Sequence, residues 1–261
     1  MSKVIIFANQ KGGVTKTSSA INLGIGLVRE GKRVLLIDND PQGSATMALG
    51  YTQPDELRLT LATIMERVIN EEDFVLTEGI VCHEEGIDLL PGNIELSGVE
   101  TTLVNIMSGE TVLREYVNLI RDQYDYILID CSPNLGMLTL NAMTCADYVI
   151  IPVQAAYLPV RGLELLLKTI SRVKRKMNPN IEILGVLLSM IDERTNYGKE
   201  IIDLLYQSYG NNIRIFESRI PFSVRAAETS ALGKSIYTHD AKGKVACAYA
   251  SLTKEVLSHE Q

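Results

Sequence analysis

The sequence predicts an α/β fold, a doubly wound and mostly parallel sheet flanked by helices. Short runs of Val, Ile and Leu recur along the chain, helical patterns lie between them, and a glycine-rich turn follows the first run. Runs that are apolar at every position suit strands covered by helices on both faces. The predicted strands are Val4 to Ala8, Arg33 to Asp38, Tyr126 to Asp130, Tyr148 to Val153 and Glu182 to Leu188.

Two of the intervening segments have helical spacing. The segment from Ser18 to Gly31 places its apolar residues on one stripe and ends at a glycine, a common helix C-cap. The segment from Leu163 to Pro179 ends at a proline. Because no linker, repeat or low-complexity tract interrupts the pattern, we expect residues 1–261 to form a single domain.

Composition limits the class of protein. A chain of 261 residues with 46% hydrophobic and 22% charged content is typical of soluble globular proteins. We expect no signal peptide, and no apolar run approaches the roughly 18 residues that a membrane span needs. The scattered cysteines predict reduced thiols in the cytoplasm rather than a metal site. They are Cys82, Cys131, Cys145 and Cys247.

Charge is distributed unevenly along the chain, which carries a net charge of −7. Through Asp130 there are 10 Lys and Arg against 20 Asp and Glu; after it there are 15 against 12, a net of +3. We therefore expect any nucleic-acid contact to come from the C-terminal half.

The turn after the first strand, NQKGGVTKTSS, departs from the usual phosphate-loop pattern. Gly-x-x-x-x-Gly-Lys-Ser/Thr would place glycines at positions 10 and 15, where this chain has Gln10 and Thr15. Only Lys16 and Thr17 fit the pattern. The turn nevertheless lies between a strand and a helix, where backbone N–H groups and the helix N-terminus form an anion site.

The residue types of this turn suit a nucleotide phosphate. Gly12 and Gly13 lack a Cβ, so the backbone can curl around an anion. Lys16 would neutralise the β- and γ-phosphates, and the Thr17 hydroxyl would reach Mg²⁺. Taken alone, the same residues could also be a glycine-rich turn with a surface lysine.

Aspartates at the ends of two predicted strands favour the phosphate interpretation. Asp38 and Asp40 end the second strand, and Asp130 ends the third, at the edge where α/β proteins bind ligands. A single such aspartate is more often a helix cap or turn former. Three of them around a Gly-Gly-Lys-Thr turn predict a magnesium nucleotide, and the absence of Asn/Thr-Lys-x-Asp favours adenine over guanine.

The motifs KGGVTKT, DNDPQG and ILIDCSPNLGMLTLNAMTCADYVIIPVQ together resemble the ParA/Soj branch of the deviant Walker A ATPases, P-loop NTPases related to MinD. The likeness runs from Lys3 to about Leu257. It implies that Lys11 reaches the partner subunit's phosphates across an ATP-bound homodimer, that Asp40 positions the attacking water, and that Asp130 is the Walker B acid.

The resemblance also implies a full set of site residues. Catalytic roles fall to Lys11, Lys16 and Asp40. Nucleotide contacts fall to Lys11, Gly12, Gly13, Val14, Thr15, Lys16, Thr17 and Ser18, and Mg²⁺ contacts to Thr17, Asp40 and Asp130. Arg219 and Arg225 fall where the family has arginines that contact DNA. Lys168, Arg172 and Lys176 lie on one helical stripe and are further candidates for DNA contact, although the same stripe could be an ordinary solvated helix face.

The function implied is an ATP-dependent switch that dimerises, binds DNA without sequence preference, and hydrolyses ATP slowly under stimulation by DNA and a ParB-like centromere-binding partner. It would partition plasmid or chromosomal DNA as a cytoplasmic, nucleoid-associated protein. We expect no N-terminal helix-turn-helix domain, because the first strand begins at Lys3. We expect no membrane binding, because the tail YASLTKEVLSHEQ has little basic face.

Two alternatives stay open from the sequence. One is a related ATPase that positions a protein cargo and uses DNA only as its track. The other is a nucleotide-dependent DNA-binding regulator with negligible hydrolysis.

Thr15 carries a separate structural prediction. A backbone nest that binds an anion alternates left- and right-handed residues, which places Gly13 and Thr15 in the left-handed region. For a β-branched residue this conformation costs about 1–2 kcal/mol. We therefore predict a positive φ at Thr15, and expect Thr15→Gly to stabilise the nucleotide-free protein.

Overall fold

The computed structural model describes residues 2–154, 159–191, 196–210 and 212–259, with the backbone alone for residues 159–162, 196–199 and 201. Within these ranges the strands form one sheet of eight, parallel except for the edge pair of β3 and β4. The predicted α/β class is confirmed. In order across the sheet the strands are β3 (Val81–Cys82), β4 (Asp88–Leu90), β2 (Val34–Asn39), β5 (Tyr126–Cys131), β1 (Lys3–Phe7), β6 (Tyr148–Gln154), β7 (Glu182–Ile191) and β8 (Ile220–Pro221).

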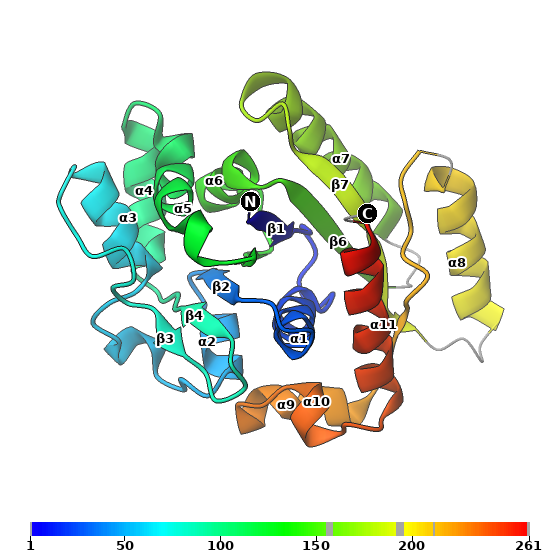
Figure 1. Cartoon of the computed structure of the whole chain (residues 1–261). Coiled ribbons are helices and arrows are strands. Elements are labelled where there is room, and N and C mark those ends of the chain that lie inside the picture. The colour runs from blue at the N-terminus through cyan, green and yellow to red at the C-terminus, as the bar shows by residue number, and fades with distance from the viewer. Residues whose placement is uncertain (1, 155–158, 192–195, 211, 260–261) are drawn as a thin grey trace.

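Helices cover both faces of the sheet (Figure 1). One face packs against α3 (Leu61–Ile69), α4 (Leu96–Asn105), α5 (Val112–Ile120), α6 (Met137–Cys145), α7 (Pro159–Lys176) and α8 (Asn196–Tyr209). The other packs against α1 (Lys16–Arg29), α2 (Ser44–Ala48), α9 (Val224–Leu232), α10 (Ile236–His239) and α11 (Lys244–Ser258). Short 3₁₀ turns occur at η1 (Pro54–Glu56), η2 (Gly109–Thr111) and η3 (Arg121–Gln123).

The apolar runs follow from this layering. In β1, Val4 and Ile6 point into the core on one face, whereas Ile5 and Phe7 point into the core on the other. All four are at most 1% exposed. Because both faces of the strand are buried, successive side chains alternate in direction while the sequence remains continuously apolar.

The first helix begins directly after the glycine-rich turn. Helix α1 starts at Lys16, two residues before the predicted segment, because the Thr15 carbonyl already accepts a hydrogen bond from Ser19 N at 2.8 Å. The helix stops as expected near Gly31, whose φ of 78° lies in the left-handed region that favours glycine. This start places Lys16 and Thr17 in the first turn, facing the carboxyl edge of the sheet.

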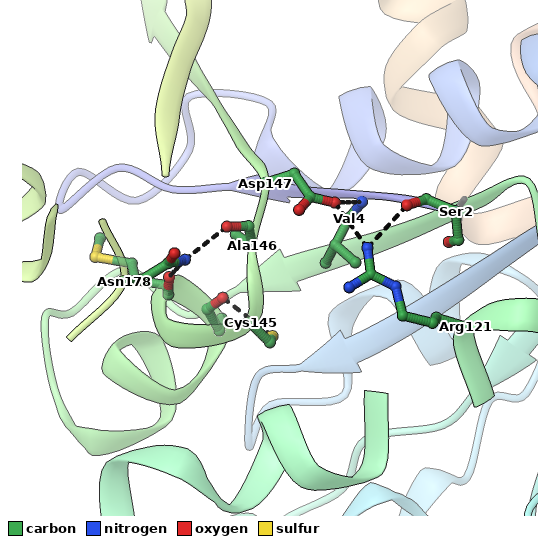
Figure 2. Close-up of polar contacts among 9 residues, drawn as sticks. Ser2, Val4, Arg121, Cys145, Ala146, Asp147 and Asn178 are labelled. Atoms are coloured by element: carbon green, nitrogen blue, oxygen red, sulfur yellow. Dashed lines mark hydrogen bonds and ion pairs between the residues drawn. The ribbon is translucent and has the colours of Figure 1, made fainter. Parts of the chain in front are cut away.

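At the amino edge of the sheet, side chains tie α7 and β1 to the loop before β6 (Figure 2). Helix α7 ends at Lys176, three residues before Pro179, and Asn178 donates to the carbonyls of Met143 at 2.9 Å and Ala146 at 2.7 Å. These bonds hold the α7–β7 connection against the end of α6.

An ion pair fixes the start of β1 at the same edge (Figure 2). Asp147 accepts hydrogen bonds from Val4 N at 2.8 Å and from Arg121 Nη2 at 3.2 Å. Arg121 Nη2 also donates to the Ser2 carbonyl at 2.9 Å. The central strand is therefore clamped at the end opposite the glycine-rich turn.

Candidate nucleotide site at the carboxyl edge of the sheet

The turn between β1 and α1 has the conformation predicted for an anion-binding loop. Gly13 has φ 71°, and Thr15 has φ 68° and ψ 22°, so both lie in the left-handed region. The positive φ predicted for Thr15 is confirmed. A Cβ built on Gly12 or Gly13 meets nothing within 4 Å, which leaves open space above the loop. Half-buried Ser18 completes the predicted set in the first turn of α1.

Three side chains hold this loop in place. Asn9 Nδ2 donates to the Pro152 carbonyl at 2.7 Å, and Asn9 Oδ1 accepts from Lys11 N at 3.0 Å. Ser189, at the end of β7, donates to the Val14 carbonyl at 3.1 Å. The third side chain is that of Lys16, whose Nζ donates a hydrogen bond to the Lys11 carbonyl within the loop. The loop is thus attached to both β6 and β7.

The two lysines of the motif occupy different environments. Lys16 is 7% exposed, and its Nζ donates to the Lys11 carbonyl at 3.2 Å, inside the curve of the loop. Lys11 is exposed, and within the described part of the chain its Nζ has only a long contact of 3.5 Å to Gln154 Oε1. One ammonium group is therefore directed into the loop, whereas the other lies on the open surface.

A hydroxyl–carboxylate pair lies beside the loop. Thr17 Oγ1 donates to Asp130 Oδ2 at 2.6 Å. The second oxygen, Asp130 Oδ1, is buried and has no hydrogen-bond partner among the described residues. A buried carboxylate oxygen without a partner is costly, and a water molecule bound to a cation would satisfy it.

Burial controls the ionisation of the charged groups around this pair. It raises the pKa of Asp130 well above its usual range, and the nearby Asp38 adds to that rise, while the Thr17 hydroxyl and Lys16 oppose it. Burial also lowers the pKa of the Lys16 ammonium, against the opposing charge of Asp130. A divalent cation would relieve the carboxylate repulsion.

The donor set fits a magnesium nucleotide rather than a metal held by protein alone. Among the described residues, no group of three or more His, Cys, Asp or Glu side chains is arranged to hold a metal. Mg²⁺ usually takes one or two protein ligands and completes its shell with phosphate and water. Thr17 and the second oxygen of Asp130 match that requirement.

Asp38 and Asp40 lie next to Asp130, but their roles differ. Asp38 is fully buried in register with Asp130, and its Oδ2 accepts bonds from Thr46 N and Thr46 Oγ1, both at 2.7 Å. Asp40 is 8% exposed, and its Oδ1 accepts from Gln42 N at 3.0 Å. Asp38 therefore supports the loop that presents Asp40.

The basic residues predicted to contact DNA form two separate groups. Lys168, Arg172 and Lys176 are exposed on α7, and Lys168 pairs with Glu164 at 2.6 Å. Arg225 is 65% exposed on α9 and pairs with Asp240 at 2.9 Å. Arg219, directly before β8, is half-buried. Because α7 and α9 cover opposite faces of the sheet, the structure does not join these residues into one patch (Figure 1).

Several supporting residues escaped the sequence analysis. Ser189 and Thr46 follow no motif spacing, since they reach the site through tertiary contacts. Gly92 also gave no signal, yet a Cβ there would lie 2.3 Å from the Asp38 carbonyl. Asn9 was within reach of prediction, because it is the polar residue between the strand and the glycine-rich turn.

Fold and site together define a P-loop nucleotide-binding protein of the deviant type, with a second lysine before the glycines. A model of the family described as AAA domain matches residues 2–183. The chain is 39% identical over 259 residues to the sporulation initiation inhibitor protein Soj of Bacillus subtilis, covering 99% of this chain and 100% of Soj. It is 38% identical over 261 residues to the chromosome partitioning protein ParA of Caulobacter vibrioides, covering 99% and 95%. The chain belongs to the ParA/Soj family of partitioning ATPases.

Solved structures share the fold over the whole chain. A Mycobacterium smegmatis protein described as cobyrinic acid a,c-diamide synthase, with a bound ATP analogue and magnesium, has a TM-score of 0.87 and 33% identity, covering 100% of this chain and 96% of that one. A putative plasmid partition protein of Borrelia burgdorferi bound to AMPPNP has a TM-score of 0.80 at 23% identity, covering 99% and 100%. At this identity, the similarity to the Borrelia burgdorferi protein shows a shared fold alone. Among the described residues, no helix is long and apolar enough to cross a membrane.

Proposed function

We propose that this protein is an ATP-dependent switch that dimerises on ATP, binds DNA without sequence preference, and hydrolyses ATP to drive partition of chromosomal or plasmid DNA. The observation that carries the proposal is the Thr17–Asp130 contact of 2.6 Å beside a loop with left-handed residues at Gly13 and Thr15. The names of the relatives Soj and ParA support partition, since they are more similar to this chain than the named synthase.

The nucleotide phosphates would be received by the backbone from Gly12 to Ser18, with Lys16 neutralising charge from inside the loop. Thr17 Oγ1 and, through water, Asp130 Oδ1 would hold Mg²⁺, which supplies positive charge at the β- and γ-phosphates. The related Mycobacterium smegmatis structures with ADP or an ATP analogue and magnesium support this cofactor pair.

Lys11 would act across a two-fold dimer. Its exposed side chain has no close acceptor besides Gln154 among its described contacts, so it is available to a phosphate on a facing subunit. In a symmetric dimer this contact occurs twice, once for each nucleotide. ATP binding would thereby supply part of the interface.

Asp40 would orient the water that attacks the γ-phosphate. It lies at the carboxyl edge, 8% exposed, on a turn fixed by Asp38. Orientation of water is a contribution to the transition state, so it affects turnover more than binding. We propose slow hydrolysis to ADP and phosphate, stimulated by DNA and by a ParB-like centromere-binding protein.

Non-specific DNA binding would use Arg225 and Arg219 near β8, with Lys168, Arg172 and Lys176 on α7 as a second group. Arginines contribute salt-sensitive phosphate contacts, and dimer symmetry doubles each of them. The same switch could move a protein cargo along DNA, and the identity of the partner protein that stimulates turnover would separate the two roles.

The test is direct nucleotide binding combined with light scattering. We expect the wild type to bind Mg²⁺–ATP in preference to Mg²⁺–GTP and to become a dimer, and we expect Lys16→Ala to lose nucleotide binding. An unchanged affinity for ATP in Lys16→Ala would refute the phosphate site. Dimerisation with GTP as strong as with ATP would refute the adenine assignment.

A further inference from the structure

A line of three hydroxyl groups connects the phosphate loop to the C-terminal helix α11. Thr15 Oγ1 lies 3.3 Å from Ser19 Oγ, and Ser19 Oγ lies 3.2 Å from the Tyr249 hydroxyl. Ser19 is 0% and Tyr249 1% exposed, so solvent does not compete for these bonds. The two buried residues have no role in the phosphate chemistry described above.

The protonated state of the buried tyrosine determines which hydroxyl donates and which accepts in each of these hydrogen bonds. Burial raises the pKa of the Tyr249 hydroxyl, which therefore keeps its proton. A buried phenol needs a hydrogen-bond acceptor, and Ser19 Oγ is within reach at 3.2 Å. With Tyr249 donating to Ser19, the Ser19 hydroxyl is free to donate to Thr15 Oγ1.

Thr15, at the loop end of these three hydroxyls, has a strained backbone conformation. Thr15 holds a left-handed conformation that β-branched residues rarely adopt. It also forms the last link of the loop before α1, where its carbonyl accepts the first helical bond from Ser19 N. A hydrogen bond to its side chain stabilises this conformation before any nucleotide arrives.

We propose that Tyr249 and Ser19 are positioning residues, which hold Thr15 and thereby the phosphate loop in the conformation that receives the nucleotide. The proposal rests on the proposed function of this loop as a nucleotide site. Neither residue needs to touch the nucleotide, so their loss should weaken binding and leave the chemical step nearly unchanged.

The principal variant is Tyr249→Phe, which removes the hydroxyl and keeps the ring. We expect its Kd for a non-hydrolysable ATP analogue with Mg²⁺ to rise about five- to tenfold, the effect of losing one buried hydrogen bond. The kcat at saturating ATP should stay within about twofold. Ser19→Ala should give the same change in Kd, and it keeps the test valid if Tyr249→Phe folds poorly.

A matched control and a rescue distinguish positioning from general stability. Tyr237 is another buried tyrosine on this face of the sheet, but its hydroxyl lies away from the loop. It is beside Gly26 of α1, so that a Cβ added to this glycine would be 2.8 Å from the hydroxyl. Tyr237→Phe should leave the Kd unchanged. In a Thr15→Gly background, Tyr249→Phe should also have no effect, because glycine adopts the left-handed conformation without support.

The outcomes separate this inference from the proposed function. If the wild type does not bind ATP, the nucleotide site is wrong and the positioning role falls with it. If the wild type binds and Lys16→Ala does not, the site stands. In that case a normal Kd in both Tyr249→Phe and Ser19→Ala would overturn the positioning role alone. An equal loss of affinity from Tyr249→Phe in the wild type and in the Thr15→Gly background would overturn it too.

Discussion

Asp38→Asn should make the folded protein more stable at pH 8. Asp38 is fully buried beneath the nucleotide site, where its carboxylate accepts two bonds from Thr46 and one from Asp40 N. Burial raises its pKa to about 6, and the neighbouring charge of Asp40 acts in the same direction, so the fold favours the protonated acid. An asparagine resembles that neutral form and cannot ionise.

The size of the effect follows from the difference in the pKa of Asp38 between the folded and unfolded states. The pKa rises from 3.8 to about 6, and at about 1.4 kcal/mol per unit this is roughly 3 kcal/mol. Because the native state binds the proton more tightly, this stability is present at low pH and is lost as the pH rises through about 6. Asparagine lacks an acceptor for the weak bond from Asp40 N, which costs about 1 kcal/mol. The net gain at pH 8 is about 2 kcal/mol.

Urea unfolding of the wild type and Asp38→Asn at pH 5.5 and pH 8 would measure this gain. Because the wild type regains part of its stability at the lower pH, the advantage of the variant should shrink there by about 1 kcal/mol. Asp125→Asn is the control: Arg33 lowers the pKa of this exposed carboxyl, so the same change should give no stabilisation. Equal stability of wild type and Asp38→Asn at pH 8 would refute the reasoning.

Three further predictions concern the switch. Lys11→Ala should bind ATP yet stay monomeric by light scattering, because it removes only the contact to the facing subunit; normal dimerisation would contradict that role. Asp40→Ala should form a stable ATP dimer that retains DNA binding and loses turnover, and turnover within a few-fold of wild type would show that the assignment is wrong. Arg225→Glu should abolish ATP-dependent DNA binding in a filter or mobility assay, whereas Arg33→Glu, which disrupts a similarly exposed arginine–aspartate pair at the amino edge, should not. Binding by the nucleotide-free protein, or binding indifferent to salt from about 50 to 200 mM, would argue against phosphate contacts.

The parts of the fold that the sequence predicted are those with strong local signals. The five central strands are continuous apolar runs, because both of their faces are buried, and each was predicted within about three residues of its observed ends. Strands β3, β4 and β8 have two or three residues each and depend on their neighbours in the sheet. Such short strands have too little periodicity to be found from sequence.

The candidate site divides in the same way. Lys16, Thr17 and Asp130 were predictable, since their positions relative to strand and helix ends follow from chain connectivity. The supports from Ser189 and Tyr249 were not, because these residues are more than 170 positions away from the loop residues that they hold.

The support at Thr15 changes one expectation. From the sequence alone, Thr15→Gly should stabilise the protein by removing strain of about 1–2 kcal/mol. The hydrogen bond from Ser19 offsets about 1 kcal/mol of that gain, and the flexibility of glycine in the unfolded chain offsets up to about 1 kcal/mol more. We therefore expect the stability of Thr15→Gly to lie close to that of the wild type.

The central place of β1 has a consequence during synthesis. This strand lies between β5 and β6, and its clamp joins Val4 to Asp147, a separation of 143 positions. At about 5–20 residues per second, the ribosome needs on the order of ten seconds to make the intervening chain. Until β5 (Tyr126–Cys131) has been made, β1 and its glycine-rich turn have no partner strand, and their apolar residues are exposed to chaperones and to other nascent chains. The nucleotide loop, although encoded early, can take its final shape only after more than half of the protein has been made.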